Sequence, residues 1–294
     1  MADLACATKV FKRTDHLERL LESVEAAGIE RMYVADDGEP GEHDRIYDRD
    51  WAFDLEVIDL EFDAGLGLGR KRFVEASEEE YLLVVDTDHE GPANYGILRE
   101  VLETYPEVGG VAGIELERGR IAGMCHDIAV EDGVLIRYAP SGEYEWESGY
   151  AFRRFDFVPN AALFRRDCVE AYNWDPEYVI AKEHLDFYYG HYVRTDWEFG
   201  ICPTVAFPHH ETSDSGYLQL RTSETRQMRS KRYFLDKWGV EQIHRRSYWL
   251  DATPHDDPIV TRIADRLPIA GTKLVHDAND EYRTLKGRFA EFVD

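Results

Sequence analysis

Short apolar segments alternate with amphipathic helical segments through the first 115 residues, and no other feature limits the fold of this chain as strongly. Strands are expected over residues 4–10, 31–35, 55–62, 81–85 and 110–116, and helices over 15–27, 68–76 and 95–105. Strands and helices that alternate at this spacing form βαβ units, whose strands run parallel. The sequence therefore predicts an α/β fold in which helices flank a mostly parallel, Rossmann-like sheet.

The pattern changes after residue 115. Residues 120–124 and 134–138 are expected to pair as a hairpin around the turn 131–133. Further apolar segments are found at 155–164 and 204–207, and further helices are expected at 166–172 and 183–191. From residue 217 onward the chain is charged and mostly helical in pattern. We therefore expect one domain over residues 1–215, in two halves that meet near residue 115, followed by a helical C-terminal extension over 216–294.

The chain carries 59 acidic and 34 basic residues, a formal net charge of -25. A surface this acidic repels nucleic acid and anionic lipid, so we expect no nucleic acid as a partner. Of the basic residues, 26 are Arg and only 8 are Lys. Strong acidity with few lysines resembles the proteins of extreme halophiles, in which high salt screens self-repulsion. An ordinarily acidic bacterial enzyme is the alternative.

The first residues lack the charged start and apolar stretch of a signal peptide, and no apolar run reaches the roughly 18 residues that a membrane span needs. This predicts a cytoplasmic protein, with a peripheral position at the cytoplasmic face of a membrane left open. The four cysteines, Cys6, Cys125, Cys168 and Cys202, are widely spaced and form no CxxC pair. They are expected to be reduced, mostly buried thiols that bind no zinc.

Two pairs of aspartates follow the second and the fourth expected strand. Asp36 and Asp37 end the second strand, and Asp86 and Asp88 follow the apolar residues 81–85. Because the carboxyl ends of parallel strands meet at one edge of a sheet, the four carboxylates should converge there. Mn²⁺ or Mg²⁺ is their natural partner, since hard cations bind carboxylate oxygens and can bridge a diphosphate. A solvated acidic turn is the alternative for each pair taken alone.

Four segments in this order resemble the nucleotide-sugar glycosyltransferases of the GT-A fold, in the broad glycosyltransferase family 2. They are residues 7–13 after the first strand, 34–38 after the second, 65–70 before a helix, and 85–88 after the buried strand. The resemblance covers roughly the first 110 residues. It implies that residues 1–115 are the nucleotide-binding half and 116–215 the acceptor half.

The resemblance also implies tasks for individual residues. Contacts to the nucleotide sugar are implied for Thr8, Val10, Arg13, Asp36, Asp37, Gly67, Arg70 and Asp86, with Asp86 directed at the ribose. The metal ligand is Asp88, joined by His210 or His209, with His210 preferred, while His89 is expected to be incidental. Arg70 also begins a basic cluster with Lys71 and Arg72, which favours anion binding in so acidic a chain.

Segments 157–164, 173–177 and 181–187 resemble the acceptor half of the same family. An inverting transfer needs a base that takes the proton of the attacking hydroxyl. Helical spacing puts Glu183 and Asp186 on one face, where either could meet that hydroxyl. Many family members have Glu-Asp where this chain has Glu183 and His184, so the candidate bases are Asp186, then Glu183, then His184.

The sequence therefore predicts a metal-dependent, inverting hexosyl- or N-acetylhexosaminyltransferase. Its donor would be a UDP- or GDP-sugar, and its acceptor a hydroxyl of a glycan, a lipid-linked glycan or a glycosylated protein. A catalytically inactive carbohydrate-binding subunit is one alternative, supported by His184 at the usual place of an aspartate. A sugar nucleotidyltransferase is another, although residues 7–13 lack the glycine that such enzymes need there. Residues 240–294 leave a homo-oligomer and peripheral membrane association open.

Overall fold

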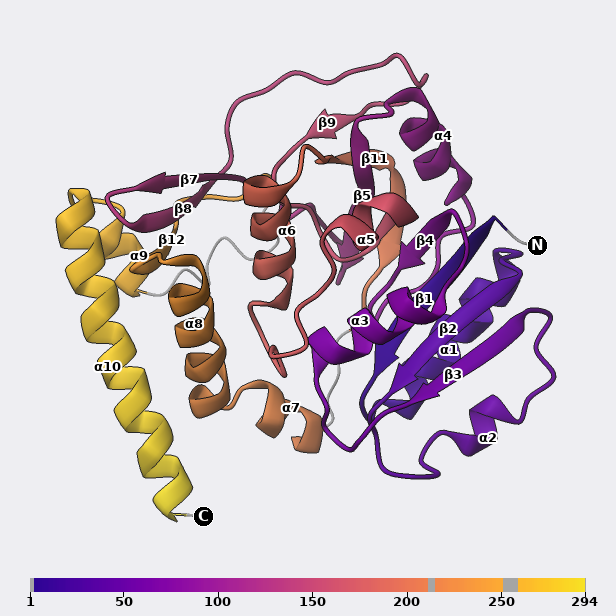
Figure 1. Ribbon diagram of the computed structural model, residues 1–294, viewed down its shortest axis with the longest axis horizontal. Helices are drawn as coiled ribbons and strands as arrows, with labels where there is room; N and C mark the ends of the chain where they lie inside the picture. Colours follow the sequence, from indigo (N-terminus) through magenta and orange to yellow (C-terminus); the bar gives the residue numbers. More distant parts are fainter. Residues whose placement is uncertain (1–2, 211–214, 251–258, 294) are drawn as a thin grey trace.

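The computed structural model describes residues 3–210, 215–250 and 259–293. Within these ranges a central sheet lies between two layers of helices, and a small second sheet connects it to the C-terminal helices (Figure 1). The α/β fold with a mostly parallel sheet is confirmed. No helix in the described ranges is both long enough and apolar enough to cross a bilayer.

The central sheet has nine strands in the described part of the chain. They are β1 (Leu4–Val10), β2 (Arg31–Asp36), β3 (Asp54–Asp59), β4 (Tyr81–Val84), β5 (Val108–Glu117), β6 (Arg120–Ala122), β9 (Arg153–Arg154), β10 (Ala162–Arg165) and β11 (Glu198–Pro208). Their order is β3-β2-β1-β4-β10-β5-β11-β9, with β6 paired to β5. β10 is antiparallel to both β4 and β5, so β1 to β5 and β11 all run in one direction. Their carboxyl ends therefore share one edge of the sheet.

Helices cover both faces of this sheet. One face is covered by α1 (Thr14–Ala26), α2 (Asp44–Tyr47) and α4 (Gly96–Thr104), the other by α3 (Leu66–Ala76), α5 (Arg166–Ala171) and α6 (Glu183–Arg194). Leu17 and Leu83 belong to the apolar core on the first face, and Phe73 and Leu82 belong to the core on the second. Leu82 and Leu83 point to opposite faces because side chains alternate along a strand, which explains the apolar run through β4.

The hairpin has a different first strand from the one the sequence predicted. β7 (Asp127–Glu131) pairs with β8 (Val134–Tyr138), while residues 120–122 pair with β5 as β6. Asp132 and Gly133 both have positive φ, 48° and 79°, as a two-residue hairpin turn requires. Such a turn pairs the residues on either side of it, Glu131 and Val134, so the strand directly before the turn is the partner.

The C-terminal part contains α7 (Ser215–Arg221), α8 (Glu224–Trp238), β12 (Gln242–Arg245), α9 (Ile259–Ala264) and α10 (Ile269–Val293). β12, which the sequence did not predict, pairs in parallel with β8 and completes a three-stranded second sheet. Ile128, Leu185, Phe234 and Ile243 share a third apolar core between this sheet, α6 and α8. The division of the chain at residue 215 stays a prediction.

Candidate active site

A pocket of about 340 Å³ opens at the carboxyl ends of β1 and β4. Its lining comes from β1, from the segments after β1, β4 and β11, from the first turns of α3 and α6, and from α7. The lining residues are Lys9, Arg13, Leu66, Arg70, Asp86, Asp88, Glu183, His209, Tyr217, Leu218 and Arg221. A ligand site at this edge is what a mostly parallel sheet predicts.

Asp86 is held by two donors from distant parts of the chain. The buried Arg70 donates to Asp86 Oδ1 at 2.5 Å and to Glu183 Oε1 at 3.1 Å. Asn160, which precedes β10, donates its side-chain amide to Asp86 Oδ2 at 2.9 Å. Burial acts to raise the pKa of Asp86, but Arg70, together with smaller contributions from His184 and His89, holds it below the ordinary value. Asp86 is therefore ionised and fixed in orientation.

Asp88 lies between an arginine and two histidines. Arg13 donates to Asp88 Oδ2 at 2.6 Å, His89 Nδ1 lies 3.3 Å from Oδ1, and His209 Nε2 lies 3.6 Å from Oδ2. The two imidazole rings stack with their centroids 4.6 Å apart, where a β-bridge joins His89 to His209. One donor atom from each of Asp88, His89 and His209 lies within 4.8 Å of the others, which is close enough to share a metal ion.

Protons on the two imidazoles balance the charge of this cluster. Burial acts to raise the pKa of Asp88, but the adjacent imidazoles of His209 and His89, with the Arg13 cation, hold it well below the ordinary value. Burial also acts to lower the pKa of His89, but the carboxylates of Asp88 and Glu115, 3.3 and 3.6 Å from its ring nitrogens, raise it to about 10. The adjacent Asp88 carboxylate raises the pKa of His209 as well. A bound cation would displace these protons, since imidazole ligates metals in its neutral form.

His210 lies outside this cluster. Its Nε2 is 2.7 Å from Glu90 Oε1, and its backbone amide donates to the Asp88 carbonyl oxygen at 2.7 Å. The geometry therefore favours His209 over His210, the residue that the sequence preferred. It also gives His89 a place in the cluster, although nothing in the spacing of the aspartates indicated it.

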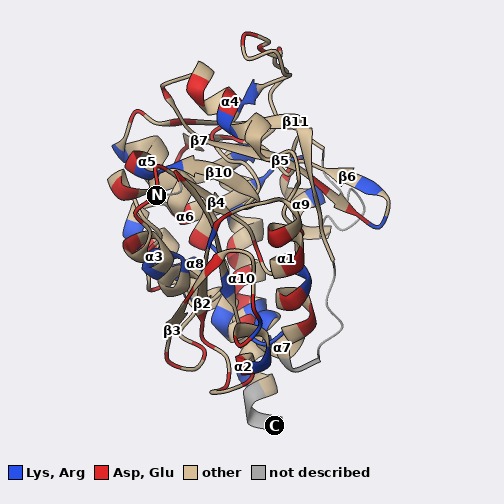
Figure 2. Cartoon of the chain, turned by 90° about the vertical axis from the view of Figure 1, so that its right-hand side faces the viewer, with Lys and Arg blue, Asp and Glu red and all other residues tan. Residues whose placement is uncertain are grey.

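Four basic side chains, Lys9, Arg13, Arg70 and Arg221, line the same pocket. Acidic residues outnumber basic ones in this chain and are found in every part of the molecule (Figure 2), so this concentration of cations favours an anionic ligand. The Arg13 guanidinium stacks 4.3 Å over the ring of Tyr217, which brings α7 against the pocket. None of Lys9, Tyr217 and Arg221 was identified from the sequence. Lys9 lies within the segment 7–13 but was given no role there, and no motif surrounds Tyr217 or Arg221.

Asp36 and Asp37 do not line the pocket. Asp37 is fully buried, pairs with Lys9 Nζ at 2.5 Å and accepts a hydrogen bond from the Gly65 amide at 2.8 Å. Asp36 is bonded to side chains of the segment 43–47 at 2.7 Å. Both carboxylates thus connect strand ends to the following loops. Their contact with a nucleotide base stays a prediction.

Three other residues expected at the nucleotide also do not line the pocket. Thr8 and Val10 are fully buried in β1. The Gly67 amide donates to the Tyr178 carbonyl oxygen at 2.9 Å, and a Cβ at Gly67 would overlap the Asp175 carbonyl oxygen. Glycine at 67 therefore allows α3 to begin directly against the segment before α6. Nucleotide contacts of these three residues stay predictions.

Asp186 is fully buried and does not line the pocket. Its carboxylate accepts hydrogen bonds from Tyr172 at 2.9 Å, Tyr178 at 3.0 Å and Trp238 at 2.8 Å, and it pairs with Lys237 at 2.8 Å. These four partners occupy both oxygens. An acceptor hydroxyl has no access to Asp186 in this arrangement. The geometry therefore does not favour Asp186, our first choice from the sequence, as the base.

Glu183, one turn earlier on α6, does line the pocket. Its Oε1 contacts Arg70, and its buried Oε2 has no hydrogen-bond partner among the described residues. Burial acts to raise the pKa of Glu183, but its neighbours His184 and Arg70 lower it below the ordinary value, and Arg70 is the cation that keeps the carboxylate ionised where the His184 imidazole is neutral. Burial lowers the pKa of His184 to about 3, so the imidazole is neutral. Glu183 is the base that the geometry favours.

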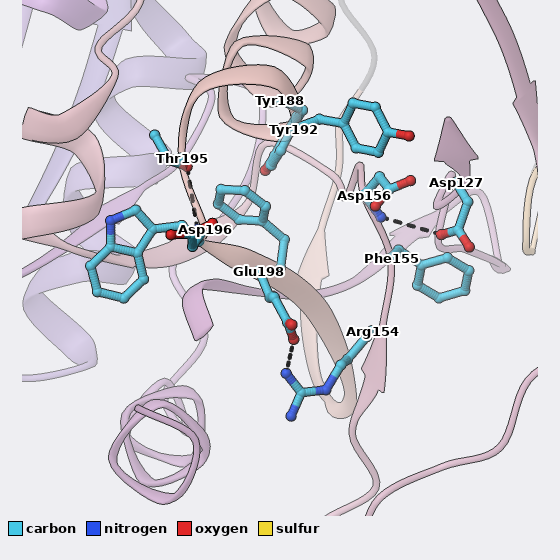
Figure 3. A pocket seen from close by; sticks show the side chains of 11 residues that line it. Asp127, Arg154, Phe155, Asp156, Tyr188, Tyr192, Thr195, Asp196 and Glu198 are labelled. Carbon is cyan, nitrogen blue, oxygen red and sulfur yellow. Dashed lines mark hydrogen bonds and ion pairs between the residues drawn. The ribbon is translucent and has the colours of Figure 1, made fainter. Parts of the chain in front are cut away.

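A second pocket, of about 530 Å³, is larger but holds none of these residues (Figure 3). Asp127, Asp156 and the Arg154–Glu198 pair line it, and burial raises the pKa of Asp156 to about 6. It lies at the first residue of β11, whereas His209 follows the last. β11 lies beside β5 from Val108 to Leu116, so it spans roughly 27 Å despite its two register shifts. This pocket is thus too far from Asp88 to share a reaction with it.

No protein-family profile matches this chain, and no curated protein matches it in sequence. Solved structures do match it in three dimensions. GalNAc-T7 with UDP, GalNAc and Mn²⁺ aligns with a TM-score of 0.58 and 13% identity, covering 94% of this chain and 54% of that chain. TarS 1–349 of S. aureus with UDP-GlcNAc aligns with a TM-score of 0.53 and 12% identity, covering 80% and 66%.

A third match is the mannosyltransferase PcManGT from Pyrobaculum calidifontis with GDP-Man and Mn²⁺. Its TM-score is 0.52 at 11% identity, and the alignment covers 80% of this chain and 64% of that chain. The chain has the GT-A glycosyltransferase fold. It spans only part of the length of these relatives, 39% of the longer TarS chain for example. At such low sequence identities the likeness concerns the fold alone.

Proposed function

We propose that this chain is a metal-dependent glycosyltransferase that moves a sugar from a nucleotide-diphosphate donor to a hydroxyl acceptor. The observation that carries the proposal is the pocket itself, in which the cluster of Asp88, His89 and His209 lies beside four basic side chains. A departing diphosphate needs this combination, since its charge is stabilised by a metal ion and by guanidinium groups. The three matched structures, which contain UDP, UDP-GlcNAc or GDP-Man, support the donor class.

The donor atoms indicate which metal the site would prefer. A carboxylate with two imidazoles suits Mn²⁺ better than Mg²⁺, which prefers oxygen ligands. Asp88, His89 and His209 would hold the ion, and two of the matched structures contain Mn²⁺. When bound, the ion supplies a Lewis acid that neutralises charge on the leaving diphosphate.

The other pocket residues would bind the donor and position the base. Arg13 pairs with Asp88 in the structure, and we infer that it turns to a diphosphate oxygen when the donor binds. Arg70 and Asn160 hold Asp86, which would accept hydrogen bonds from the ribose hydroxyls. Arg70 also fixes Glu183, so one arginine orients a donor-binding carboxylate and the base together.

The proposed reaction inverts the anomeric centre, with Glu183 as its base. The acceptor hydroxyl attacks the anomeric carbon, the carbon–oxygen bond to the diphosphate breaks, and the hydroxyl proton passes to Glu183 Oε2. Proton NMR of the product tests this. From an α-linked donor, the account predicts a β-linked product, and an α-linked product would contradict inversion.

Turnover tests the proposed function as a whole. UDP-GlcNAc, UDP-GalNAc and GDP-Man are incubated with the chain and Mn²⁺, with and without glycan and lipid-linked acceptors, and nucleotide release is measured. We expect release from at least one donor, loss of release in EDTA, and loss in Asp88→Asn. Full turnover in metal-free buffer would contradict the metal assignment. Metal-dependent nucleotide binding without any turnover would instead favour an inactive carbohydrate-binding subunit.

A further inference from the structure

Helix α10 exposes a stripe of large apolar side chains to solvent. Leu274, Tyr282, Leu285 and Phe289 are 69%, 65%, 65% and 71% exposed, and Ala278 between them is exposed as well. They recur every three or four residues, so they lie on one side of the helix. A rise of 1.5 Å per residue makes this stripe about 22 Å long.

The opposite side of α10 is polar and faces the rest of the chain. Asp280 pairs with Lys231 at 2.5 Å and Arg283 pairs with Glu224 at 2.5 Å, both on α8. His276 lies 2.9 Å from His244 of β12. α10 is therefore attached to its own chain through charged and polar groups.

This arrangement is the reverse of the usual one. A surface helix normally buries its apolar stripe against the core and gives its polar side to water. In α10 the polar side is buried and the apolar side is exposed to solvent. This exposure has a free-energy cost that grows with the exposed apolar area. A partner that covers the stripe removes this cost.

Charge along the helix indicates which partner fits. Beside the stripe, Asp277 and Glu281 lie in its first half, and Lys286 and Arg288 lie in its second half. An antiparallel copy of the same helix would place the acidic half against the basic half, whereas a parallel copy would align like charges. An anionic membrane fits poorly, because the chain carries a net charge of -25.

We propose that the outer stripe of α10 is the interface of a two-fold symmetric dimer, in which the α10 helices of two copies pack antiparallel. A two-fold axis between positions 281 and 282 sets Leu274 of one copy opposite Phe289 of the other, and Ala278 opposite Leu285. Such an interface uses the same surface on both copies and closes on itself. α8 lies on the other side of α10 (Figure 1), so the two bodies extend in opposite directions. This proposal does not depend on the proposed enzymatic function.

Sedimentation equilibrium of the full chain tests the dimer. At about 20 μM we expect the mass of two chains, and Leu285→Glu should weaken dimerisation about 100-fold or more because two leucines leave each interface. Val193→Glu is the matched control, since Val193 is an apolar side chain 53% exposed on a different helix, α6. Circular dichroism and the melting temperature show that both variants are folded. A monomeric wild-type chain, or equal effects of both variants, would overturn the proposal.

Disulfide cross-linking tests the direction of the helices. The four native cysteines are buried, so they give little background. Tyr282→Cys lies near the two-fold axis and should cross-link to itself under mild oxidation. Leu274→Cys should cross-link when mixed with Phe289→Cys but not alone. Cross-linking of Leu274→Cys alone would overturn the antiparallel arrangement.

Vesicle flotation tests the other possible occupant of the stripe. Wild-type chain is mixed with phosphatidylcholine vesicles and with vesicles that also contain phosphatidylserine. The proposal predicts that neither carries the chain upward. Flotation that Leu285→Glu abolishes and Val193→Glu keeps would assign the stripe to a lipid surface and overturn the dimer.

Discussion

At the scale of single residues, the pocket depends on which carboxylates already have partners. Asp37 and Asp186 are fully buried and pair with Lys9 and Lys237. Glu183 keeps one oxygen without a partner among the described residues. Only a carboxylate with a vacant oxygen can take a proton from a substrate, which is why Glu183 is the proposed base.

Two isosteric substitutions separate the base from the buried carboxylate. Glu183→Gln should lower kcat by about 10² to 10⁴ while donor affinity and melting temperature change little. Asp186→Asn should instead destabilise the chain by about 1 to 3 kcal/mol, because the new amide NH₂ faces buried donors such as Tyr178 and Trp238, and Lys237 keeps Asp175 as its remaining carboxylate partner. Steady-state kinetics and urea unfolding measure both. Full activity in Glu183→Gln, or a stable Asp186→Asn that binds donor without turning it over, would contradict the assignment.

The histidine assignment makes a separate prediction. His209→Ala and His89→Ala should each weaken Mn²⁺ binding at least about tenfold, because each removes one of three ligands. His210→Ala is the control and should change Mn²⁺ affinity little, since His210 pairs with Glu90. Electron paramagnetic resonance of free Mn²⁺ gives the affinities without an activity assay. A loss confined to His210→Ala would restore the sequence-based choice.

The strand-end aspartates could be identified from the sequence because they follow a strand that is wholly apolar. The choice between Glu183 and Asp186 could not, since residues three positions apart share a helix face. Lys237, which donates a hydrogen bond to the Asp186 carboxylate, lies 51 residues later in the chain. His89 could not be identified either, because its stacking partner His209 comes from another strand.

At the scale of elements, the start of α3 is fixed by close contact with the segment before α6. The amides of Leu66 and Gly67 donate to the carbonyl oxygens of Val179 and Tyr178 at 3.0 and 2.9 Å. These bonds satisfy donors that a helix start otherwise leaves free. They also place Arg70, one turn later, beside Asp86.

Gly67→Ala tests this contact. The new Cβ would overlap the Asp175 carbonyl oxygen, so we expect unfolding free energy to fall by about 2 kcal/mol or more. Gly96→Ala is the control. A Cβ at Gly96 meets nothing within 4 Å, and alanine is the better helix former, so this variant should be neutral or slightly stabilised. Urea unfolding compares the two. Equal stability of both variants would contradict the packing of the α3 start.

Most elements of the first half could be predicted because their hydrophobic periodicity is local. The hairpin strand β7 was missed because residues 120–124 are as apolar as the true partner, and the turn geometry decides between them. β12 was missed because it is only four residues long. Its hydrogen bonds to β8 join segments about a hundred residues apart, which no local pattern shows.

At the scale of the whole molecule, net charge governs stability. A charge of -25 repels itself, and the Debye length falls from about 10 Å at 0.1 M salt to about 3 Å at 1 M. The melting temperature should therefore rise by several degrees between 0.1 M and 2 M KCl. A variant that neutralises three exposed acids, Asp50→Asn, Glu61→Gln and Glu78→Gln, should depend less steeply on salt. A melting temperature that falls with salt would contradict the halophile interpretation.

The central claim at this scale is that the pocket binds a metal-bridged nucleotide diphosphate through Asp88. Isothermal titration calorimetry of UDP and GDP tests it most directly, with and without Mn²⁺, on the wild-type chain and on Asp88→Asn. The account predicts one site that binds at least one of the two diphosphates, at least about tenfold tighter with Mn²⁺. It also predicts that Asp88→Asn removes the Mn²⁺ effect. Failure of both diphosphates to bind with Mn²⁺, or equal binding by Asp88→Asn, would contradict it.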